Sequence, residues 1–237
     1  MKLYDTYLFD ADGTLFDTVD LICRCFDYIL EKYGCRSLPR QQIMAGIGSP
    51  LVNQIVNHLG PGLDYDMILD DYLQYQLQAM KGSVKLFPEV ATVLAALQES
   101  GRRLAIVTSR KRLSLEVLLQ ITGTSKYFDA LVTPEDTGRH KPDPEPALKA
   151  MALLGADRDK TVFVGDAHFD ICSGAGAGID TIFVKWSHFD PSALPVSPTW
   201  MIKSMRELCA ALPGCFANNF GSGSTCADTL KGQDIYR

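Results

Sequence analysis

Two aspartates, Asp10 and Asp12, stand one residue apart after a short apolar segment and directly before Gly13. A glycine that follows an apolar run marks a turn, so we expect both carboxylates at the exposed end of a strand. Carboxylates in such a position can bind a hard cation, attack an electrophile or move a proton. This stretch is therefore the first candidate for chemistry.

Three later places also fall at the carboxyl ends of predicted strands. They hold Thr108 and Ser109, then Lys141, and then Asp166 together with Asp170. Open α/β sheets place their ligand crevice at this edge, so these side chains should converge. Carboxylates suit magnesium, while a hydroxyl and an ammonium can hold phosphate oxygens. The set predicts a site for a phosphoryl group and Mg²⁺.

Each place has an ordinary structural explanation when it is taken alone. Two nearby aspartates are usually a solvated turn, a lysine before a proline is a helix-start signal, and Asp166 could cap the next helix. For Asp170, a capping or supporting role and direct metal binding are equally compatible with the sequence. The functional interpretation depends on the joint occurrence of these residues.

The elements that must position these residues follow two patterns. Residues 4–10 form a predicted strand, and helical spacing of apolar residues then predicts helices at 18–33, 39–45, 51–59 and 65–80. Beyond residue 82 strands alternate with helices. The predicted strands are 104–109, 130–132, 161–164, 181–184 and 200–202, and the predicted helices are 88–100, 113–121, 144–154, 171–177 and 205–212.

This order predicts an α/β fold with a Rossmann-like parallel sheet, helices on both faces and an inserted α-helical cap. The predicted core comprises residues 1–17 and 83–213, and the helical cap comprises residues 18–82. Residues 214–237 are rich in Gly and Ser and are predicted to be a loosely packed tail.

Composition excludes several classes of protein. A net charge of -5 and a pI of about 5.4 argue against nucleic-acid binding, which needs a dense basic patch. The 7 cysteines form no Cys-x-x-Cys pair, and we expect reduced thiols. The chain shows neither a signal peptide nor an apolar run of membrane length, so we expect no membrane partner and a cytoplasmic location. The sequence does not indicate an oligomeric state.

The four places match, in order, the motifs of the haloacid dehalogenase superfamily. Residues 10–14 resemble its first motif, Thr108 its second, Lys141 its third and residues 165–170 its fourth. The resemblance spans residues 4 to about 186. Two details, residues 15–18 and 141–146, look most like the phosphoglycolate phosphatase-like branch, whose α-helical cap occupies the same insertion point.

The resemblance implies a division of labour. Asp10 would be the nucleophile and a metal ligand, with Asp166, the backbone carbonyl of Asp12 and Asp170 as further ligands. Asp12 would exchange protons with the leaving group and with water, which requires surroundings that shift its ionisation. The phosphate would be held by Gly13, Thr108, Ser109 and Lys141.

Further candidates for substrate contact lie in the predicted cap. Arg24 is seven residues after Asp17 and so lies on the same helix face. Gly46, Ile47 and Gly48 look like the loop that family caps lower onto the substrate, although this loop could simply join two helices.

Other charged residues receive the simpler interpretation. Arg110, Lys111, Arg112 and Arg139 form a basic cluster near the proposed mouth, and such runs are usually solvated faces that can at most steer an anion. The histidines at positions 58, 140, 168 and 188 are excluded as site residues.

The predicted function is an Mg²⁺-dependent phosphatase that acts on a small phosphorylated metabolite through an aspartyl-phosphate. Phosphoglycolate is the substrate that the resemblance suggests, while inorganic pyrophosphate, sugar phosphates and nucleotides stay open. Asp12 favours phosphate esters over carbon–halogen bonds, because a departing halide needs no proton donor.

Two rivals use related chemistry. A phosphomutase of the β-phosphoglucomutase type is disfavoured by Ile22, Ala45 and Ser49, which stand where that branch has a histidine and two basic residues. A phospho-aspartate receiver is disfavoured because receivers lack the helical insert and carry their aspartate on a later strand.

Overall fold

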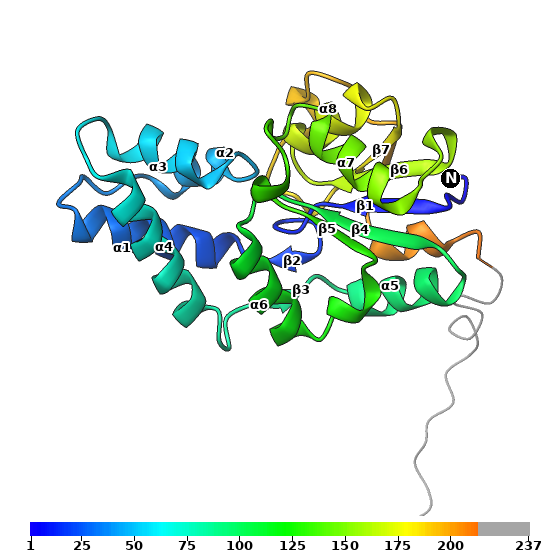
Figure 1. Ribbon diagram of the computed structural model, residues 1–237, viewed down its shortest axis with the longest axis horizontal. Helices are drawn as coiled ribbons and strands as arrows, with labels where there is room; N and C mark the ends of the chain where they lie inside the picture. Colours follow the sequence, from blue (N-terminus) through cyan, green and yellow to red (C-terminus); the bar gives the residue numbers. More distant parts are fainter. Residues whose placement is uncertain (213–237) are drawn as a thin grey trace, which may run out of the picture.

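A six-stranded, wholly parallel sheet forms the centre of the computed structural model, which describes residues 1–212 (Figure 1). The strand order is β5-β4-β1-β6-β7-β8. The bounds are β1 Thr6–Phe9, β4 Arg103–Val107, β5 Ala130–Val132, β6 Thr161–Gly165, β7 Asp180–Val184 and β8 Trp200–Ile202. The predicted α/β fold class is confirmed.

Helices cover both faces of this sheet. They are α5 Val90–Glu99, α6 Arg112–Thr122, α7 Glu145–Leu154 and α8 His168–Gly176. Successive strand residues point to opposite faces, so Tyr7 and Phe9 join a cluster with α5 and α6, while Leu8 joins a second cluster with α7. Because both faces are buried, the strands have continuous apolar sequences.

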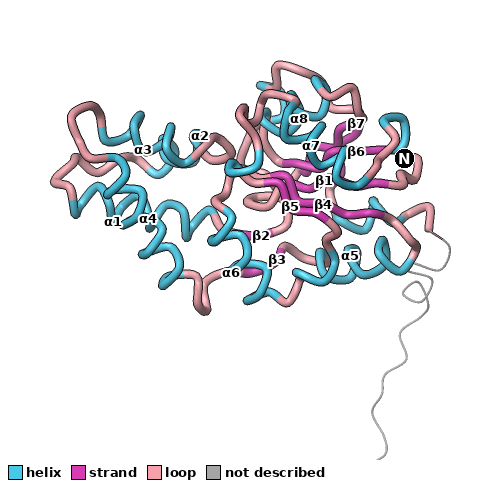
Figure 2. The backbone as a smooth tube through the Cα atoms, viewed as in Figure 1, coloured by secondary structure: helices cyan, strands magenta, loops and turns pink. Residues whose placement is uncertain are grey.

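Four consecutive helices follow β1 in the chain and lie together beside the sheet (Figures 1 and 2). They are α1 Val19–Lys32, α2 Arg40–Gly46, α3 Leu51–Leu59 and α4 Tyr65–Ala79. Aromatic pairs hold α1 against α4: the ring centroids of Phe26 and Tyr72 are 5.2 Å apart, and those of Tyr28 and Tyr75 are 4.4 Å apart. These helices correspond to the segment predicted to be a cap.

A two-stranded antiparallel ribbon lies where the chain leaves and re-enters the sheet region. It consists of β2 Phe16–Asp17 and β3 Lys85–Leu86 and was not anticipated from the sequence. Strands of two residues are too short to show a periodic pattern. The ribbon ties the start of α1 to the segment that follows α4.

Short 3₁₀ turns complete the described chain. They are η1 Ser125–Tyr127, η2 Pro134–Asp136, η3 Arg158–Lys160, η4 Pro191–Ala193 and η5 Met205–Cys209. The helix predicted at 205–212 is wrong in type, because Ser204 and Glu207 close a short 3₁₀ turn. The predicted tail at 214–237 lies outside the described residues. Among the helices described, none has the length and hydropathy needed to cross a membrane.

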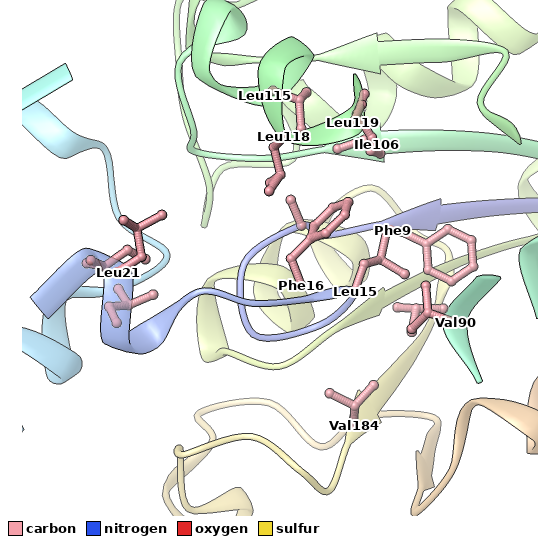
Figure 3. Packing of buried hydrophobic residues seen from close by; sticks show 14 of the residues in the cluster. Phe9, Leu15, Phe16, Leu21, Val90, Ile106, Leu115, Leu118, Leu119 and Val184 are labelled. Atoms are coloured by element: carbon pink, nitrogen blue, oxygen red, sulfur yellow. The ribbon is translucent and has the colours of Figure 1, made fainter. Parts of the chain in front are cut away.

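The loop after β1 is anchored by apolar side chains. Leu15 and Phe16 are fully buried and lie in the same cluster as Phe9, Val90 and Leu118 (Figure 3). Packing of this kind holds the residues between Phe9 and Leu15 on a rigid support. The aspartates of this loop therefore have fixed positions.

Candidate active site

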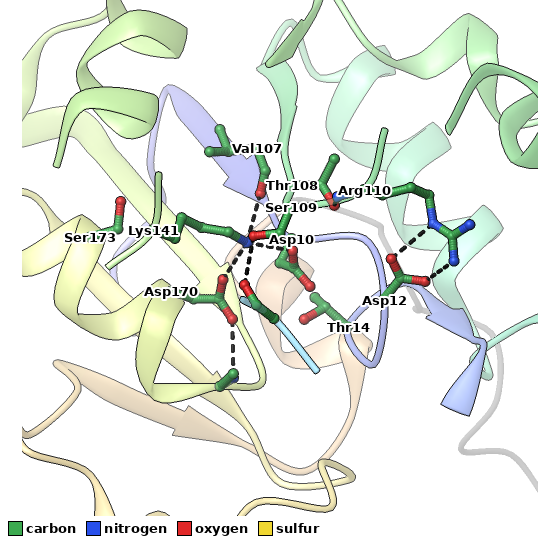
Figure 4. Close-up of polar contacts among 12 residues, drawn as sticks. Asp10, Asp12, Thr14, Val107, Thr108, Ser109, Arg110, Lys141, Asp170 and Ser173 are labelled. Carbon is green, nitrogen blue, oxygen red and sulfur yellow. Dashed lines mark hydrogen bonds and ion pairs between the residues drawn. The ribbon is translucent and has the colours of Figure 1, made fainter. Parts of the chain in front are cut away.

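Side chains from four distant parts of the chain meet at the carboxyl edge of the sheet (Figure 4). Asp10 follows β1, Thr108 follows β4, and Asp166 follows β6. Lys141 comes from the segment between β5 and α7 and reaches Asp10. These residues therefore lie close together, as the sequence predicted.

Lys141 is the charged centre of this cluster. Its Nζ donates to Asp10 Oδ1 at 2.6 Å, to Asp170 Oδ1 at 2.7 Å and to the carbonyl oxygen of Val107 at 3.1 Å. These contacts use all three ammonium donors. Burial alone would lower the pKa of Lys141, but Asp10 and Asp170 outweigh burial and raise it. Lys141 is therefore a fixed positive charge.

Three buried carboxylates lie close together here, and two of them, Asp10 and Asp170, bind the single ammonium of Lys141. Oxygens of Asp10, Asp166 and Asp170 lie within 4.8 Å of one another. Burial raises the pKa of Asp10 to about 7, although Lys141 partly offsets it, and burial followed by the charge of Asp10 raises the pKa of Asp166 well above its usual value. The cluster thus has more negative charge than its protein partners neutralise. Its oxygen donors fit a hard divalent cation.

Asp170 has both of its oxygens engaged. Oδ1 accepts from Lys141, while Oδ2 accepts from the backbone N–H groups of Asp166 at 3.2 Å and Ala167 at 3.0 Å. The close approach requires a glycine at Gly165, since a Cβ there would lie 2.2 Å from that of Asp170. Asp170 therefore both orients Lys141 and fixes the backbone that carries Asp166.

Asp166 is held by hydroxyl groups from two loops. Thr14 Oγ1 donates to its Oδ1 at 3.4 Å, and Ser187 Oγ lies 3.2 Å from its Oδ2 and 2.7 Å from its carbonyl oxygen. Gly13 has φ +86° and passes so close that a Cβ would lie 2.3 Å from Asp166 Oδ2. The structure thus places Gly13 against a carboxylate. Ser187 was missed from the sequence, although it follows the end of β7 at the same edge of the sheet.

Asp12 points away from this cluster and toward Arg110, so Lys141 and Asp12 lie on opposite sides of Asp10 in Figure 4. The guanidinium of Arg110 binds both oxygens of Asp12, with Nε to Oδ2 at 2.9 Å, and the hydroxyl of Thr18 donates to Oδ1. Burial alone would raise the pKa of Asp12, but Arg110 outweighs it, and the pKa is lowered. Asp12 is held here as a carboxylate, the form that can accept a proton.

The solvated interpretation of Arg110 is therefore wrong. Arg110 is 7% exposed, and its Nη1 donates to Ser114 Oγ at 2.6 Å. The Ser114 hydroxyl in turn contacts Gln76 of α4, so bonds run from Asp12 to the α1–α4 helices. The neighbouring Arg112, in contrast, is partly exposed, as expected for a solvated cation, and pairs with Asp136.

The predicted substrate loop lies against the sheet edge. Ser109 Oγ donates to the carbonyl oxygen of Gly48 at 2.6 Å, and Ile47 is buried. Gly48 has φ +100°, and a Cβ there would lie 2.8 Å from the Phe169 ring. Thr108 is 6% exposed, and its Oγ1 accepts from the N–H of Arg110 at 3.1 Å.

A cavity of about 50 Å³ opens between the sheet edge and the α1–α4 helices. Its core side is formed by Asp10, Asp12, Thr108, Ser109, Arg110 and Lys111. Its helical side is formed by Ile22, Ile47, Gly48, Ser49, Leu51, Gln54, Tyr72, Leu73 and Gln76. A cavity of this size has room for a few water molecules, or for a correspondingly small group.

Two of the predicted cap contacts do not line this cavity. Arg24 is exposed on α1, and Gly46 lies behind the loop, where its nearest neighbours are Gln54 and His58. The four histidines also lie outside the lining. The Nε2 atom of one of them, His188, lies 3.0 Å from the carbonyl oxygen of Met44 and so forms a further contact between the core and the helices.

The family model of haloacid dehalogenase-like hydrolases matches residues 7–184, a range that includes all of the clustered residues. The chain belongs to this family. Curated relatives in it are the pyrophosphatases PpaX of Bacillus pumilus and Oceanobacillus iheyensis. The first is 36% identical over 207 residues, covering 87% of this chain and 95% of its own. The second is 33% identical over 213 residues, covering 90% and 98%.

Solved structures of this family share the fold. A haloacid dehalogenase-like protein from Bacteroides fragilis superposes with a TM-score of 0.80 at 27% identity, covering 86% of this chain and 99% of its own. CbbY from Rhodobacter sphaeroides, solved with phosphate, gives a TM-score of 0.75 at 20% identity, covering 87% and 96%. The predicted family and hydrolase class are confirmed.

Proposed function

We propose that this protein is an Mg²⁺-dependent phosphatase that transfers a phosphoryl group from a small substrate first to Asp10 and then to water. The observation that carries the proposal is the buried cluster of Asp10, Asp166 and Asp170, two of which bind Lys141, beside a small cavity. A magnesium ion held by Asp10, Asp166 and Asp170 would neutralise the excess negative charge and polarise the phosphoryl oxygens.

In the first step an Asp10 oxygen attacks phosphorus, and the bond from phosphorus to the leaving group breaks with its electron pair going to that group. Lys141 reduces the charge repulsion between carboxylate and phosphate. In this proposal the hydroxyl of Thr108 and the backbone N–H of Ser109 would hold phosphate oxygens.

In the second step water attacks the phosphorus of the aspartyl-phosphate, and the bond to Asp10 breaks. Asp12 accepts the proton of that water, and inorganic phosphate leaves. Asp12 then gives this proton to the leaving group of the next substrate or to solvent, which restores its carboxylate. The α1–α4 helices act as a cap that limits the access of other water molecules to this intermediate.

Inorganic pyrophosphate is the substrate that we place first, because relatives 31–36% identical are named pyrophosphatases and the cavity is small. A phosphoglycolate-like monoester is the second candidate, on the resemblance of residues 15–18 and 141–146 to that branch. Mutase chemistry is disfavoured because Ile22 and Ser49 line the cavity in place of basic groups.

A test of the proposal measures phosphate release from pyrophosphate, 2-phosphoglycolate, a sugar phosphate and a nucleoside monophosphate, with Mg²⁺ and with a chelator. We expect turnover only with Mg²⁺ and the highest kcat/KM for pyrophosphate. Mg²⁺ should also raise the unfolding temperature of the wild type, and Asp166→Asn should remove most of that increase. Equal turnover in the chelator would contradict the proposal.

A further inference from the structure

Two adjacent residues that follow β7 contact two different parts of the molecule. Ser187 Oγ lies 2.7 Å from the carbonyl oxygen of Asp166 and 3.2 Å from its Oδ2, within the core. His188 Nε2 lies 3.0 Å from the carbonyl oxygen of Met44, in α2. Because the Cα atoms of adjacent residues are only about 3.8 Å apart, a shift at one of these contacts is passed to the other. We call residues 187–188 the clasp.

The Ser187 end of the clasp holds both the backbone and the carboxylate of Asp166. A hydroxyl has a single hydrogen, and the two Asp166 oxygens that face it can only accept. Ser187 Oγ also accepts from the backbone N–H of Phe189 at 2.9 Å, so its own hydrogen is left for Asp166. Hydrogen bonds of this kind fix the orientation of a carboxylate that binds a metal ion.

The His188 end of the clasp holds the start of the loop formed by residues 46–49. A carbonyl oxygen can only accept, so Nε2 of His188 carries the hydrogen of this bond. The Met44 carbonyl also accepts from the N–H of Ile47 at 3.1 Å, and therefore lies where α2 ends and the loop begins. The Phe189 ring lies against the imidazole, with centroids 4.2 Å apart, and restricts its rotation.

The far end of the same loop has a separate contact with the core. Ser109, which follows β4, donates to the carbonyl oxygen of Gly48 at 2.6 Å. The clasp follows β7, and β1 and β6 lie between β4 and β7 in the sheet, so the loop is held from two sides of the carboxylate cluster. Of these two contacts, the clasp is the one that joins the loop to a residue of that cluster.

We propose that Ser187 and His188 are positioning residues that link Mg²⁺ binding at the carboxylate cluster to the seating of the 46–49 loop. This inference rests on the proposed Mg²⁺ site and adds how the helices respond to it. While His188 holds Met44, Ser187 stays in place to orient Asp166, and a carboxylate that is already oriented binds a cation more tightly. Coupling between two sites is reciprocal, so bound Mg²⁺ should in turn favour the seated loop.

The first test is a calorimetric titration of the full chain with Mg²⁺ alone. Ser187→Ala should weaken Mg²⁺ binding roughly 10-fold, the usual effect of removing a group that orients a metal ligand. His188→Leu should weaken it several-fold, although the described hydrogen bond of His188 is to Met44, whereas His188→Gln keeps an N–H donor and should restore most of the affinity. The matched control is Ser192→Ala, at an exposed position in the same segment, which should bind Mg²⁺ like the wild type.

Hydrogen exchange measures the reverse effect. Mg²⁺ should slow amide exchange in the peptide that covers residues 43–51 of the wild type, and should slow it less in His188→Leu. In the double variant Ser187→Ala/His188→Leu the Mg²⁺ affinity should equal that of Ser187→Ala, because His188 acts through Ser187. Circular dichroism and unfolding temperatures establish that each variant is folded.

Two results would overturn the link yet leave the phosphatase proposal standing. One is wild-type Mg²⁺ affinity in both Ser187→Ala and His188→Leu, or fully additive losses in the double variant. The other is an effect of Mg²⁺ on exchange that is the same in the wild type and in His188→Leu. Wild-type protein that binds no Mg²⁺ would overturn both proposals.

Discussion

The core side of the cavity contains charged side chains, whereas its helical side contains only apolar or neutral ones. On the core side, charged groups are buried and bound to one another, with Lys141 held by two carboxylates and Arg110 held by Asp12. On the helical side, side chains such as Leu51 and Leu73 bring no charge. Changes in the core should therefore alter the reaction itself, whereas changes in the helices should alter which substrates reach it.

The largest effect in this comparison should come from Asp10→Asn. The amide has nearly the shape of the carboxylate but is a poor nucleophile, so kcat should fall by roughly 10⁴-fold or more. Removing a carboxylate from a crowded buried cluster should leave the fold intact. Steady-state kinetics and an unfolding curve check both parts. Substantial residual turnover by a folded variant would remove Asp10 from the chemistry.

Lys141→Ala should come next. It leaves Asp10 and Asp170 without their shared ammonium, so we expect kcat/KM to fall roughly 10²- to 10³-fold. Loss of a buried ion-pair partner should also lower the free energy of unfolding by about 3 kcal/mol. Kinetics and denaturant unfolding measure the two effects. Wild-type KM and kcat in this variant would show that Lys141 is not part of the site.

Gly48→Ala, which changes the helical side of the cavity, should have an intermediate effect on kcat/KM. The new Cβ would meet the Phe169 ring and push the loop away from Ser109, so kcat/KM should fall about 10-fold. Gly34→Ala is the matched control, because Gly34 also has a positive φ but nothing near its Cβ. Both should lose about 1 kcal/mol of stability from the backbone. Equal kinetic losses in the two variants would exclude a role for the loop contact.

Leu51→Ala should have the smallest effect and should widen the selectivity. The shorter side chain enlarges the cavity from the helical side, so kcat/KM for a bulkier phosphomonoester should rise several-fold relative to pyrophosphate, about 1 kcal/mol. Val52→Ala, on the exposed face of the same helix, serves as the control. A relative preference that is the same in both variants would mean that the helical side does not set substrate size.

The elements and the buried cluster at the sheet edge follow closely from the sequence. The apolar run at 161–164 predicts a strand that the structure extends to Gly165, and the polar residues that follow each strand meet because parallel strands share one carboxyl edge. Lys141, Asp10 and Asp170 were predicted to converge, and the structure adds their direct contacts of 2.6 and 2.7 Å.

Other features depend on contacts that a local pattern does not contain. Arg110, Lys111 and Arg112 are three adjacent cations, and only the pairing of Arg110 with Asp12, 98 positions earlier, selects the one that is buried. The β2 and β3 ribbon likewise depends on long-range pairing of two-residue segments. Ser187 could have been predicted from the sequence. It follows β7, and polar residues that follow parallel strands lie at the same edge of the sheet.

The most direct test of the central claim is to trap the phosphoryl group on the enzyme. Wild-type protein is mixed with pyrophosphate and Mg²⁺, quenched in acid within the first turnover, and digested for mass spectrometry. We expect one added phosphoryl group on the peptide that contains Asp10, and none there in Asp10→Asn. A phosphoryl group on a different residue, or full turnover with no phosphorylated enzyme at any time, would contradict the account.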